Sequence, residues 1–401
     1  MNQWDIFKYA REHDTYYSEL YSLLGANVSW EQIPIVDQKS FWEKHPYKNN
    51  TSTSAVVFRS GGTTGKPKCS VFSVPEWRQF VQCFGAGFSN SGLRAGDRVG
   101  NLFFSGDMYA SFLFIKDSLE NAPFPVEHFP ISGGLEHKNI AQILTDYPIN
   151  VLAGVPSALV QLAEYLETHE IKIPIETILF GGEFLFKNQE NFLKKVFPNV
   201  HLSSIGHASV DAGHLGKSCG QANGLHEVFL ETSLMEIVDE MGNTITTPHV
   251  AGRLIYTNFT RKMMPIVRYP VGDNAVWVEV GKTYRIQGRT DEGARIGPVT
   301  ITREDFLSSV GNLNIMEFQF HLKHAEHDYL EVTYVADEKI SRDEINFLTE
   351  RFYHNKPMYL DCVNKKLIAP ISFKQIDSNL LVKNGRTGKL VLCIDERFNN
   401  P

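Results

Sequence analysis

The sequence predicts an α/β protein of two unequal parts, and three observations support this prediction. Short apolar runs alternate with helical patterns through the first half of the chain, which is typical of a sheet that is at least partly parallel. From about residue 225 the pattern changes to short β-like runs with little helix between them. After a polar stretch at 288–291, the order strand, helix, strand, strand, helix, strand suits a small ferredoxin-like α+β domain. We therefore expect a large N-terminal α/β domain with layered sheets and a β-rich subdomain, followed by the small domain.

The individual elements follow from apolar periodicity and from chain breakers. Apolar residues near helical spacing predict a first helix over 4–24, which Gly25 ends. The other expected helices lie near 76–90, 110–120, 138–146, 156–168, 187–196, 303–309 and 341–353. The expected strands lie near 56–58, 99–104, 149–153, 178–180, 228–231, 234–238, 252–258, 275–280, 283–287, 296–301, 315–335 (two strands) and 360–368.

Composition excludes several classes of protein. The 401 residues are 42% hydrophobic and 21% charged, which is too apolar for a disordered chain and too polar for a membrane bundle. The net charge of -7 argues against a nucleic-acid binder. No apolar run approaches the roughly 18 residues needed to span a bilayer, and the N-terminus lacks signal-peptide features. Five scattered cysteines suit reduced thiols, so we expect a cytoplasmic protein without membrane or nucleic-acid partners.

The most informative segment runs from Ser60 to Lys68 and reads Ser-Gly-Gly-Thr-Thr-Gly-Lys-Pro-Lys. Its glycines permit positive φ and close backbone approach, while its hydroxyls, backbone N–H groups and Lys68 can all bind oxyanions. The segment follows an expected strand, as a phosphate-binding loop does. It is not a Walker A loop, because Ser60 replaces the first glycine and Pro67 follows Lys66, so a P-loop kinase or ATPase is disfavoured. The structural alternative is an ordinary surface turn.

This segment resembles the phosphate loop of the adenylate-forming superfamily, which comprises acyl-CoA synthetases, peptide-synthetase adenylation domains and luciferases. Five later segments are similar to superfamily elements in the expected order, so the resemblance covers effectively the whole chain. They are Gly181-Gly182-Glu183, His207-Ala208-Ser209-Val210-Asp211, Arg268-Tyr269-Pro270-Val271-Gly272-Asp273, Gly288-Arg289-Thr290-Asp291 and Gly385-Arg386-Thr387-Gly388-Lys389. Residues 16–21 and 30–34 look most like the phenylacetate–CoA ligase branch. Residues 101–109 and 209–213 are similar to stand-alone aryl-acid adenylating enzymes of phenazine antibiotic pathways.

The resemblance implies an enzyme that makes an acyl-AMP from a carboxylic acid, with an aryl acid favoured, and ATP with Mg²⁺. It then passes the acyl group to the thiol of CoA or of carrier-protein phosphopantetheine, as enzymes of secondary metabolism do. The implied catalytic residues are Lys389, Asp211, which would bind Mg²⁺, and Lys68. The implied ATP-binding residues are Ser60, Gly61, Gly62, Thr63, Thr64, Gly65, Gly182, Glu183, His207, Ala208, Asp273 and Arg289. Residues 1–289 would bind ATP and acid, and residues 290–401 would be a mobile lid that carries Lys389 and pivots at Thr290 and Asp291.

Two residues depart from the pattern of the superfamily. His207 stands where the family usually has a tyrosine that stacks on adenine, and its imidazole offers less stacking area. Asp211 stands where the family usually has a glutamate; aspartate is a comparable oxygen ligand for Mg²⁺ with a shorter reach. The acid pocket is expected to be apolar, with about half of its candidates belonging to the core instead. Those candidates are Phe103, Phe104, Met108, Tyr109, Phe180, Gly181, Phe184 and His207.

Several alternatives stay open at this point. The acyl acceptor is an amine in one of them, and in another the chain is a catalytically degenerate nucleotide-binding protein of the same fold. Cys219 and His226 are the candidate ligands if zinc is bound, but their spacing fits no standard zinc signature, so zinc is not expected. A homodimer is also left open.

Overall fold

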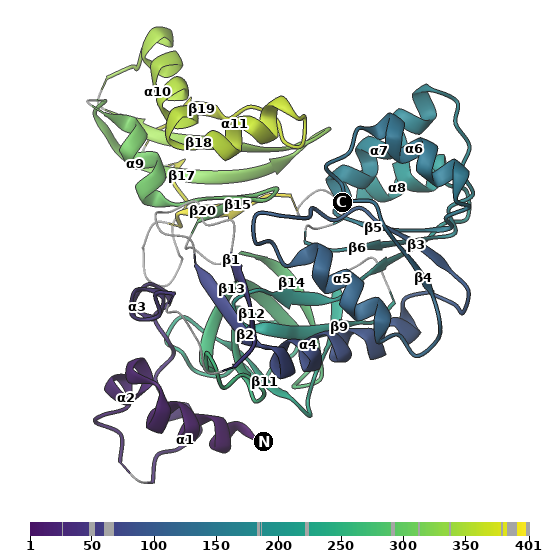
Figure 1. Ribbon diagram of the computed structural model, residues 1–401. Helices are drawn as coiled ribbons and strands as arrows, with labels where there is room; N and C mark the ends of the chain where they lie inside the picture. Colours follow the sequence, from purple (N-terminus) through teal and green to yellow (C-terminus); the bar gives the residue numbers. More distant parts are fainter. Residues whose placement is uncertain are drawn as a thin grey trace. The chain divides into compact units, whose positions relative to one another are not determined.

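The computed structural model describes residues 1–25, 27–47, 53–59, 68–182, 185, 187–220, 224–289, 293–311, 313–336, 338–377, 380–382 and 391–397. These described residues form two compact units, one ending at Ile286 and one beginning at Gln287. Figure 1 shows helices and strands mixed in both units, which confirms the predicted α/β class. Among the described residues, none of the helices has the length and apolar character needed to cross a bilayer.

A parallel sheet with helices on both faces occupies part of the first unit, with the strand order β4-β3-β5-β6-β7 among the described residues. Its strands are β3 (Arg98–Asn101), β4 (Glu127–Pro130), β5 (Val151–Gly154), β6 (Thr177–Phe180) and β7 (His201–Ser204). Helices α6 (His137–Asp146), α7 (Pro156–Thr168) and α8 (Lys187–Val196) cover one face, and α4 (Val74–Gly87) and α5 (Ser111–Glu120) the other (Figure 1). Successive strand residues point to opposite faces, so Leu152 packs with α6–α8 while Val151 packs with α4 and α5.

A second, antiparallel sheet of the first unit curls strongly. Its strands are β8 (His207–Ser209), β9 (Gly213–Ser218), β10 (Leu225–Val228), β11 (Ser233–Val238), β12 (Ala251–Asn258), β13 (Ile266–Glu279) and β14 (Thr283–Arg289). In the described residues the order is β11-β12-β13-β14-β10-β9-β8. Strands β13 and β8 are four places apart, which is about 19 Å in a flat sheet. Yet His207 Nε2 on β8 lies 3.2 Å from Asp273 Oδ2 on β13, so the curl itself brings these two residues together.

The N-terminal segment contains α1 (Gln3–His13), α2 (Thr15–Leu20), the 3₁₀ turn η1 (Trp30–Gln32) and α3 (Gln38–Lys44). The prediction of one helix over 4–24 is therefore wrong. Asp14 is extended, and its side chain accepts a hydrogen bond from the backbone N–H of Tyr17 at 3.2 Å. This is how an N-cap starts a new helix, and it explains the break between α1 and α2.

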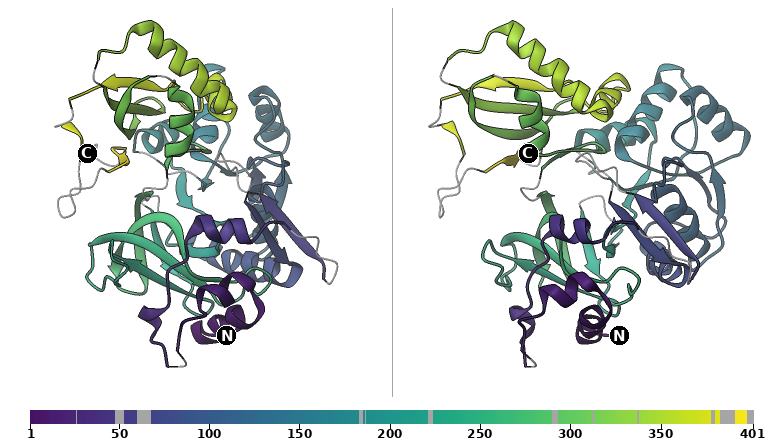
Figure 2. Two further views of the ribbon diagram at one scale, coloured as in Figure 1. Left: turned by 90° about the vertical axis from the view of Figure 1, so that its left-hand side faces the viewer. Right: turned by 60° about the vertical axis from the view of Figure 1, so that its left-hand side comes forward.

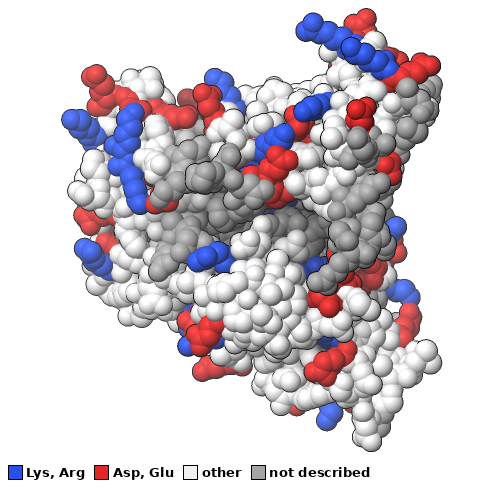
Figure 3. Space-filling model, turned by 180° about the vertical axis from the view of Figure 1, so that it is seen from behind, with Lys and Arg blue, Asp and Glu red and all other residues white. Residues whose placement is uncertain are grey.

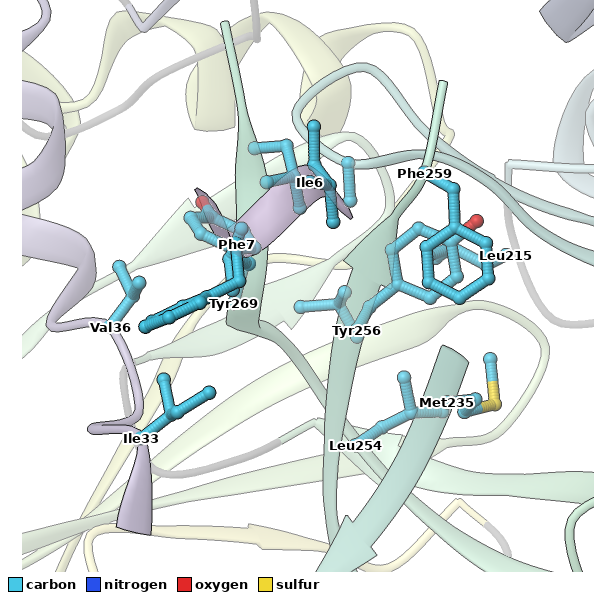
Figure 4. Packing of buried hydrophobic residues seen from close by; sticks show 14 of the residues in the cluster. Ile6, Phe7, Ile33, Val36, Leu215, Met235, Leu254, Tyr256, Phe259 and Tyr269 are labelled. Carbon is cyan, nitrogen blue, oxygen red and sulfur yellow. The ribbon is translucent and has the colours of Figure 1, made fainter. Parts of the chain in front are cut away.

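These N-terminal helices share a core with the curled sheet. Figure 4 shows Ile6 and Phe7 of α1 lying against sheet residues that include Tyr256 and Tyr269. The buried guanidinium of Arg268 adds a polar anchor, because it pairs with Glu236 at 3.1 Å and donates to the backbone carbonyl of Glu31 at 3.2 Å. The N-terminal segment is thus fixed to the same strand, β13, that carries Tyr269 and Asp273.

The second unit is a four-stranded sheet whose described order is β19-β18-β17-β20. Its elements are the hairpin β15 (Ala294–Ile296) and β16 (Val299–Ile301), then α9 (Arg303–Val310), β17 (Ile315–His324), β18 (Asp328–Ala336), α10 (Arg342–Asn355), α11 (Pro357–Asn364), β19 (Ser372–Gln375) and β20 (Cys393–Asp395). Side chains of α9, α10 and α11 pack with Phe318 and Phe320 of the sheet in one core. Figure 2 shows these helices beside the strands of the unit.

Two expectations for this unit differ from the structure. The strand predicted near 360–368 is largely the helix α11, which starts with Pro357 in its first turn and buries Tyr359 and Cys362 at helical spacing. The strand predicted near 296–301 pairs as the separate hairpin β15–β16 instead of joining the four-stranded sheet. The ferredoxin-like order is therefore not confirmed in the described residues.

Candidate active site

A two-stranded hairpin holds the predicted phosphate-binding segment. Strands β1 (Ala55–Arg59) and β2 (Cys69–Ser73) are antiparallel, with Arg59 opposite Cys69. The segment between them therefore leaves and rejoins the hairpin at the same place. The predicted residues Ser60, Gly61, Gly62, Thr63, Thr64 and Gly65 lie outside the described residues, whereas Lys68, directly before β2, is described.

The structure brings two of the predicted site residues, Lys68 and Asp211, together. The Nζ atom of Lys68 lies 3.6 Å from Oδ2 of Asp211, and their side chains are 33% and 15% exposed. Asp211 sits in the turn between β8 and β9, so 143 positions of sequence separate the two residues. The same Oδ2 atom accepts a hydrogen bond of 3.1 Å from the hydroxyl of Tyr269 on β13. An ammonium group and an oriented carboxylate thus meet at the mouth of the hairpin.

Two residues of α3 join this pair, and the sequence analysis missed both. The indole Nε1 of Trp42 donates to the Tyr269 hydroxyl at 2.9 Å. Gln38 Oε1 accepts from Lys68 Nζ at 3.1 Å, and Gln38 Nε2 donates to the backbone carbonyl of Pro270 at 2.5 Å. No local pattern marks these residues, because their partners lie 30 to more than 200 residues away. The one available signal is their i, i+4 spacing, which places polar groups on one face of a short helix.

Arg261 was also missed, and it joins the hairpin to the Asp211 turn. Its guanidinium is buried, donates to the backbone carbonyl of Asp211 and to that of Val71 (the latter at 2.9 Å), and lies 3.9 Å from the ring centre of Phe72. Desolvation lowers the pKa of Arg261 to about 10, so it remains charged at neutral pH. A fixed positive charge therefore lies beneath the turn that carries Asp211.

His207 and Asp273, predicted for adenine and ribose, lie together on the curled sheet. His207 Nε2 is 3.2 Å from Asp273 Oδ2, and His207 Nδ1 is 2.9 Å from the hydroxyl of Tyr284. An ionised carboxylate only accepts hydrogen bonds, so in a neutral His207 the proton sits on Nε2 and Tyr284 donates to Nδ1. Burial raises the pKa of Tyr284 well above its ordinary value, which keeps this phenol protonated. Both ring nitrogens are thus engaged, and the orientation of the imidazole is fixed.

The remaining predicted ATP-site residues are placed only in part. A Cβ added at Gly181 would lie 2.4 Å from the side chain of Ile205, which would have to shift, and Gly182 has a positive φ of 80°. Ala208 is exposed on β8. The residues or side chains that lie outside the described part of the chain are Glu183, Arg289 (side chain), Thr290, Asp291, Phe184 and Lys389.

The candidates for the acid pocket separate into two groups. Phe103 and Phe180 are buried in the cores on opposite faces of the parallel sheet. Phe104, Met108 and Tyr109 lie on the segment after β3, where Phe104 is 50% and Met108 46% exposed. Met108 and Tyr109 line a pocket of about 290 Å³ whose other walls are Val56, Val57, Phe58, Ser105, Gly106, Phe112 and Leu113. The pocket is apolar and includes residues of β1, one of the two strands that flank the predicted phosphate-binding segment.

The candidate zinc ligands do not form a cluster within the described ranges, where no three His, Cys, Asp or Glu side chains come together as a metal site. Burial raises the pKa of the Cys219 thiol, which disfavours the thiolate that binds zinc. His226 is buried, and its ring packs against His207 and Tyr284 at 5.7 and 5.6 Å. Its surroundings are those of a core histidine.

Two buried histidines predict a loss of stability in acid. Desolvation lowers the pKa of His226 and of His214 to about 3 each, so both stay neutral in the folded protein at pH 5. The unfolded chain binds these protons below about pH 6.5, so the free energy of unfolding falls as the pH drops from 6.5 towards 3. Between pH 7 and pH 5 we expect a loss of about 2 kcal/mol for each histidine. Urea denaturation at both pH values measures it, and His226→Gln should remove about half; an unchanged pH dependence would contradict this.

The net charge of the chain does not favour binding of a polyanion. The formal net charge is -7, and on the face shown in Figure 3 the Lys and Arg side chains of the described residues are interspersed with Asp and Glu. Lys68 beside the hairpin supplies a local positive charge that can attract phosphate.

Comparison with known proteins finds relatives by sequence. No family model matches the chain. It is 21% identical over 320 residues to the phenylacetate–coenzyme A ligase of Pseudomonas putida, a match that covers 76% of the chain and 70% of the ligase. A phenylacetate–coenzyme A ligase of Thermus thermophilus is 24% identical over 63% of the chain and 56% of that protein. The indoleacetate–lysine synthetase of Pseudomonas savastanoi is 25% identical over 61% of the chain and 59% of the synthetase. The chain thus spans less than two thirds of the latter two relatives.

Solved structures match over a larger share of the chain. A 2-hydroxyisobutyryl-CoA ligase, in complex with 2-HIB-AMP and CoA, has a TM-score of 0.68 at 17% identity, covering 99% of this chain and 90% of that one. The amide bond synthetase McbA from Marinactinospora thermotolerans has a TM-score of 0.54 at 14% identity, covering 86% and 69%. These likenesses show a shared fold.

Proposed function

Since the chain belongs to the adenylate-forming superfamily, in its phenylacetate–CoA ligase-like branch, we propose that it activates a carboxylic acid with ATP. The acid displaces pyrophosphate to give an acyl-adenylate, and the acyl group then passes to the thiol of CoA. The acid that we favour is an aryl acid. Residues 290–401, with Lys389, act as the mobile part that delivers this lysine, and Thr290 and Asp291 act as its hinge.

One observation carries this proposal: Lys68 and Asp211 meet at the point where the two ends of the phosphate-binding segment join the hairpin. Attack of a carboxylate on the α-phosphorus brings anions together, so catalysis needs positioning and charge neutralisation more than proton transfer. Lys68 and the segment 60–65 bind the triphosphate. His207 packs on the adenine, while Asp273 and Arg289 bind the ribose hydroxyls.

The residues at this point fit Mg²⁺. Mg²⁺ is usually held by one or two carboxylates together with substrate phosphates and water, so a single protein carboxylate is enough. Asp211 supplies a hard oxygen ligand that is 15% exposed and held by Tyr269. The ion would neutralise phosphate charge there, while Tyr269 and Arg261 fix the carboxylate and the turn that carries it.

The acid is assigned to the apolar pocket lined by Met108 and Tyr109. An apolar lining favours an aromatic or other apolar acid over a charged one. The similarity of residues 101–109 and 209–213 to aryl-acid adenylating enzymes of phenazine pathways supports an aryl acid as well. The backbone N–H of Arg59 donates to the carbonyl of Met108 at 3.1 Å, so this wall of the pocket is tied to the phosphate-binding hairpin.

An amine is the second candidate acceptor, and specific comparisons favour it. Two similar proteins, indoleacetate–lysine synthetase and the amide bond synthetase McbA, are named for joining an acyl group to nitrogen. A carrier-protein thiol is the third. All three acceptors follow the same first step, so they differ only in what discharges the acyl-adenylate.

A pyrophosphate-release screen tests the proposal and separates the acceptors. The full-length protein is incubated with ATP, Mg²⁺ and a panel of aryl, fatty and short acids, alone and then with CoA, a loaded carrier protein, lysine or hydroxylamine. Acid-dependent pyrophosphate release that CoA accelerates supports the ligase. Acceleration by amines alone supports the amide-forming alternative. ATP binding without pyrophosphate release for any acid would contradict both and indicate a catalytically degenerate protein.

A further inference from the structure

Helix α3 presents two polar side chains to the phosphate and metal site. Gln38 and Trp42 are spaced i, i+4, so they lie on the same face of the helix, one turn apart. Asp37 caps the helix by accepting from the backbone N–H of Ser40 at 2.8 Å, and the fully buried ring of Phe41 anchors it in the core. The cap and Phe41 hold α3 in place. The polar groups of Gln38 and Trp42 are therefore not needed to anchor the helix and can bind residues of the site.

Trp42 is connected to Asp211 by two successive hydrogen bonds. Its Nε1 donates to the Tyr269 hydroxyl at 2.9 Å, and that hydroxyl donates to Asp211 Oδ2 at 3.1 Å. A hydroxyl that accepts one hydrogen bond becomes a better donor for the next, so the indole strengthens the contact with Asp211. Asp211 is thereby held in one orientation.

Gln38 binds Lys68 and the backbone of Pro270 through the two ends of its side-chain amide. Its Oε1 accepts from Lys68 Nζ at 3.1 Å, while its Nε2 donates to the carbonyl of Pro270 at 2.5 Å. Gln38 as a whole is 8% exposed, and both ends of its amide are used, so the amide cannot rotate without losing both contacts. The Lys68 ammonium also lies 5.7 Å from the ring centre of Trp42, within reach of a cation–π attraction.

We propose that Gln38 and Trp42 are positioning residues for the phosphate and metal site: Trp42 orients Asp211 through Tyr269, and Gln38 orients the Lys68 ammonium. This inference rests on the proposed function, in which Asp211 binds Mg²⁺ and Lys68 binds phosphate. It adds the N-terminal segment to a site for which the sequence analysis named no residue before Ser60. All five residues belong to the first compact unit.

Equilibrium binding of ATP as a function of Mg²⁺ concentration tests the proposal without turnover. Trp42→Phe keeps an aromatic ring near Lys68 and removes the indole N–H donor together with part of the ring. We expect it to raise the half-saturating Mg²⁺ concentration about 5-fold, the effect of one neutral hydrogen bond. Tyr269→Phe should raise the half-saturating Mg²⁺ concentration about 10-fold, because it removes the hydrogen-bond donor to the metal-binding carboxylate of Asp211. Gln38→Leu should weaken ATP binding about 5-fold at saturating Mg²⁺, because it frees the lysine.

A matched control and a double-mutant cycle distinguish positioning from a general effect on the fold. The indole of Trp77 also donates to a carboxylate, Asp117 Oδ2 at 2.5 Å, in a different core cluster. Trp77→Phe should leave the Mg²⁺ dependence unchanged. In an Asp211→Asn background, Trp42→Phe should have no further effect on Mg²⁺ dependence, because the residue on which it acts has lost its charge.

The outcomes separate this inference from the proposed function. If the wild-type protein binds ATP with Mg²⁺ and Trp42→Phe shows the wild-type Mg²⁺ dependence at unchanged thermal stability, the positioning role is overturned while the function stands. An effect of Trp42→Phe that persists in full in the Asp211→Asn background also overturns it. If the wild-type protein shows neither ATP binding nor any dependence on Mg²⁺, the proposed function fails, and this inference fails with it.

Discussion

Replacement of Lys389 by alanine is expected to lower acid-dependent formation of the acyl-adenylate by about 100- to 1000-fold. The attacking carboxylate and the α-phosphate are both anions, and in our proposal Lys389 bridges them as charge develops in the transition state. Removal of a group that acts mainly in the transition state lowers kcat, with a smaller effect on the KM for ATP. Exchange of labelled pyrophosphate into ATP, with the best acid of the panel, measures the effect directly.

Two controls make this result specific. Lys365 lies in the same unit, its side chain is 63% exposed and its Nζ pairs with Asp361 at 2.8 Å, so Lys365→Ala should keep wild-type exchange. Discharge of purified acyl-adenylate by CoA should be nearly unaffected in Lys389→Ala, because the lysine serves the first half-reaction only. Undiminished exchange in Lys389→Ala would show that the catalytic role is wrongly assigned.

Asp211→Asn is expected to reduce adenylation about 100-fold and to raise the Mg²⁺ concentration needed for half-maximal rate. The amide keeps the size of the side chain but removes the charge that attracts the ion. It also leaves Lys68, 3.6 Å away, without its carboxylate partner. The rate measured over a range of Mg²⁺ concentrations separates these effects, since a weakened metal site is partly rescued by excess Mg²⁺.

Asp211→Glu is the matched control, because it restores the charge and the longer side chain that is usual at this place in the superfamily. We expect activity within about 10-fold of the wild type, although Tyr269 then meets a displaced carboxylate. Thermal unfolding should change little in Asp211→Glu, because the carboxylate that pairs with Lys68 is kept. An Asp211→Asn variant with wild-type rates at low Mg²⁺ would refute the assignment.

The sequence allowed much of the fold to be predicted, because most elements show their own periodicity. The buried runs at β5 and β6 and the helical patterns at α6 and α7 are local signals, and each coincides with an observed element. The predictions were wrong where a single residue starts a helix that the apolar pattern does not show. Asp14 interrupts an otherwise continuous helical pattern because its side chain caps the following helix. Residues 360–368 look β-like, yet Pro357 starts the helix α11 just before them.

The site could be predicted only as separate pieces. Motifs identified Lys68, His207, Asp211 and Asp273, and the structure joins them into two pairs. The contact between His207 and Asp273 depends on the curl of the antiparallel sheet, and that between Lys68 and Asp211 depends on the packing of a separate hairpin against it; no local pattern encodes either. Trp42, Tyr269 and Arg261 were missed as site residues for the same reason, since their contacts with the site link positions 50 to more than 200 residues apart.

The most direct test of the central claim is exchange of labelled pyrophosphate into ATP by the wild-type protein, with and without each acid of the panel. We predict exchange that requires both Mg²⁺ and an apolar, preferably aryl, acid, because only reversible acyl-adenylate formation returns pyrophosphate to ATP. Formation of ADP in place of AMP, or no exchange with any acid while the protein still binds ATP, would contradict the account.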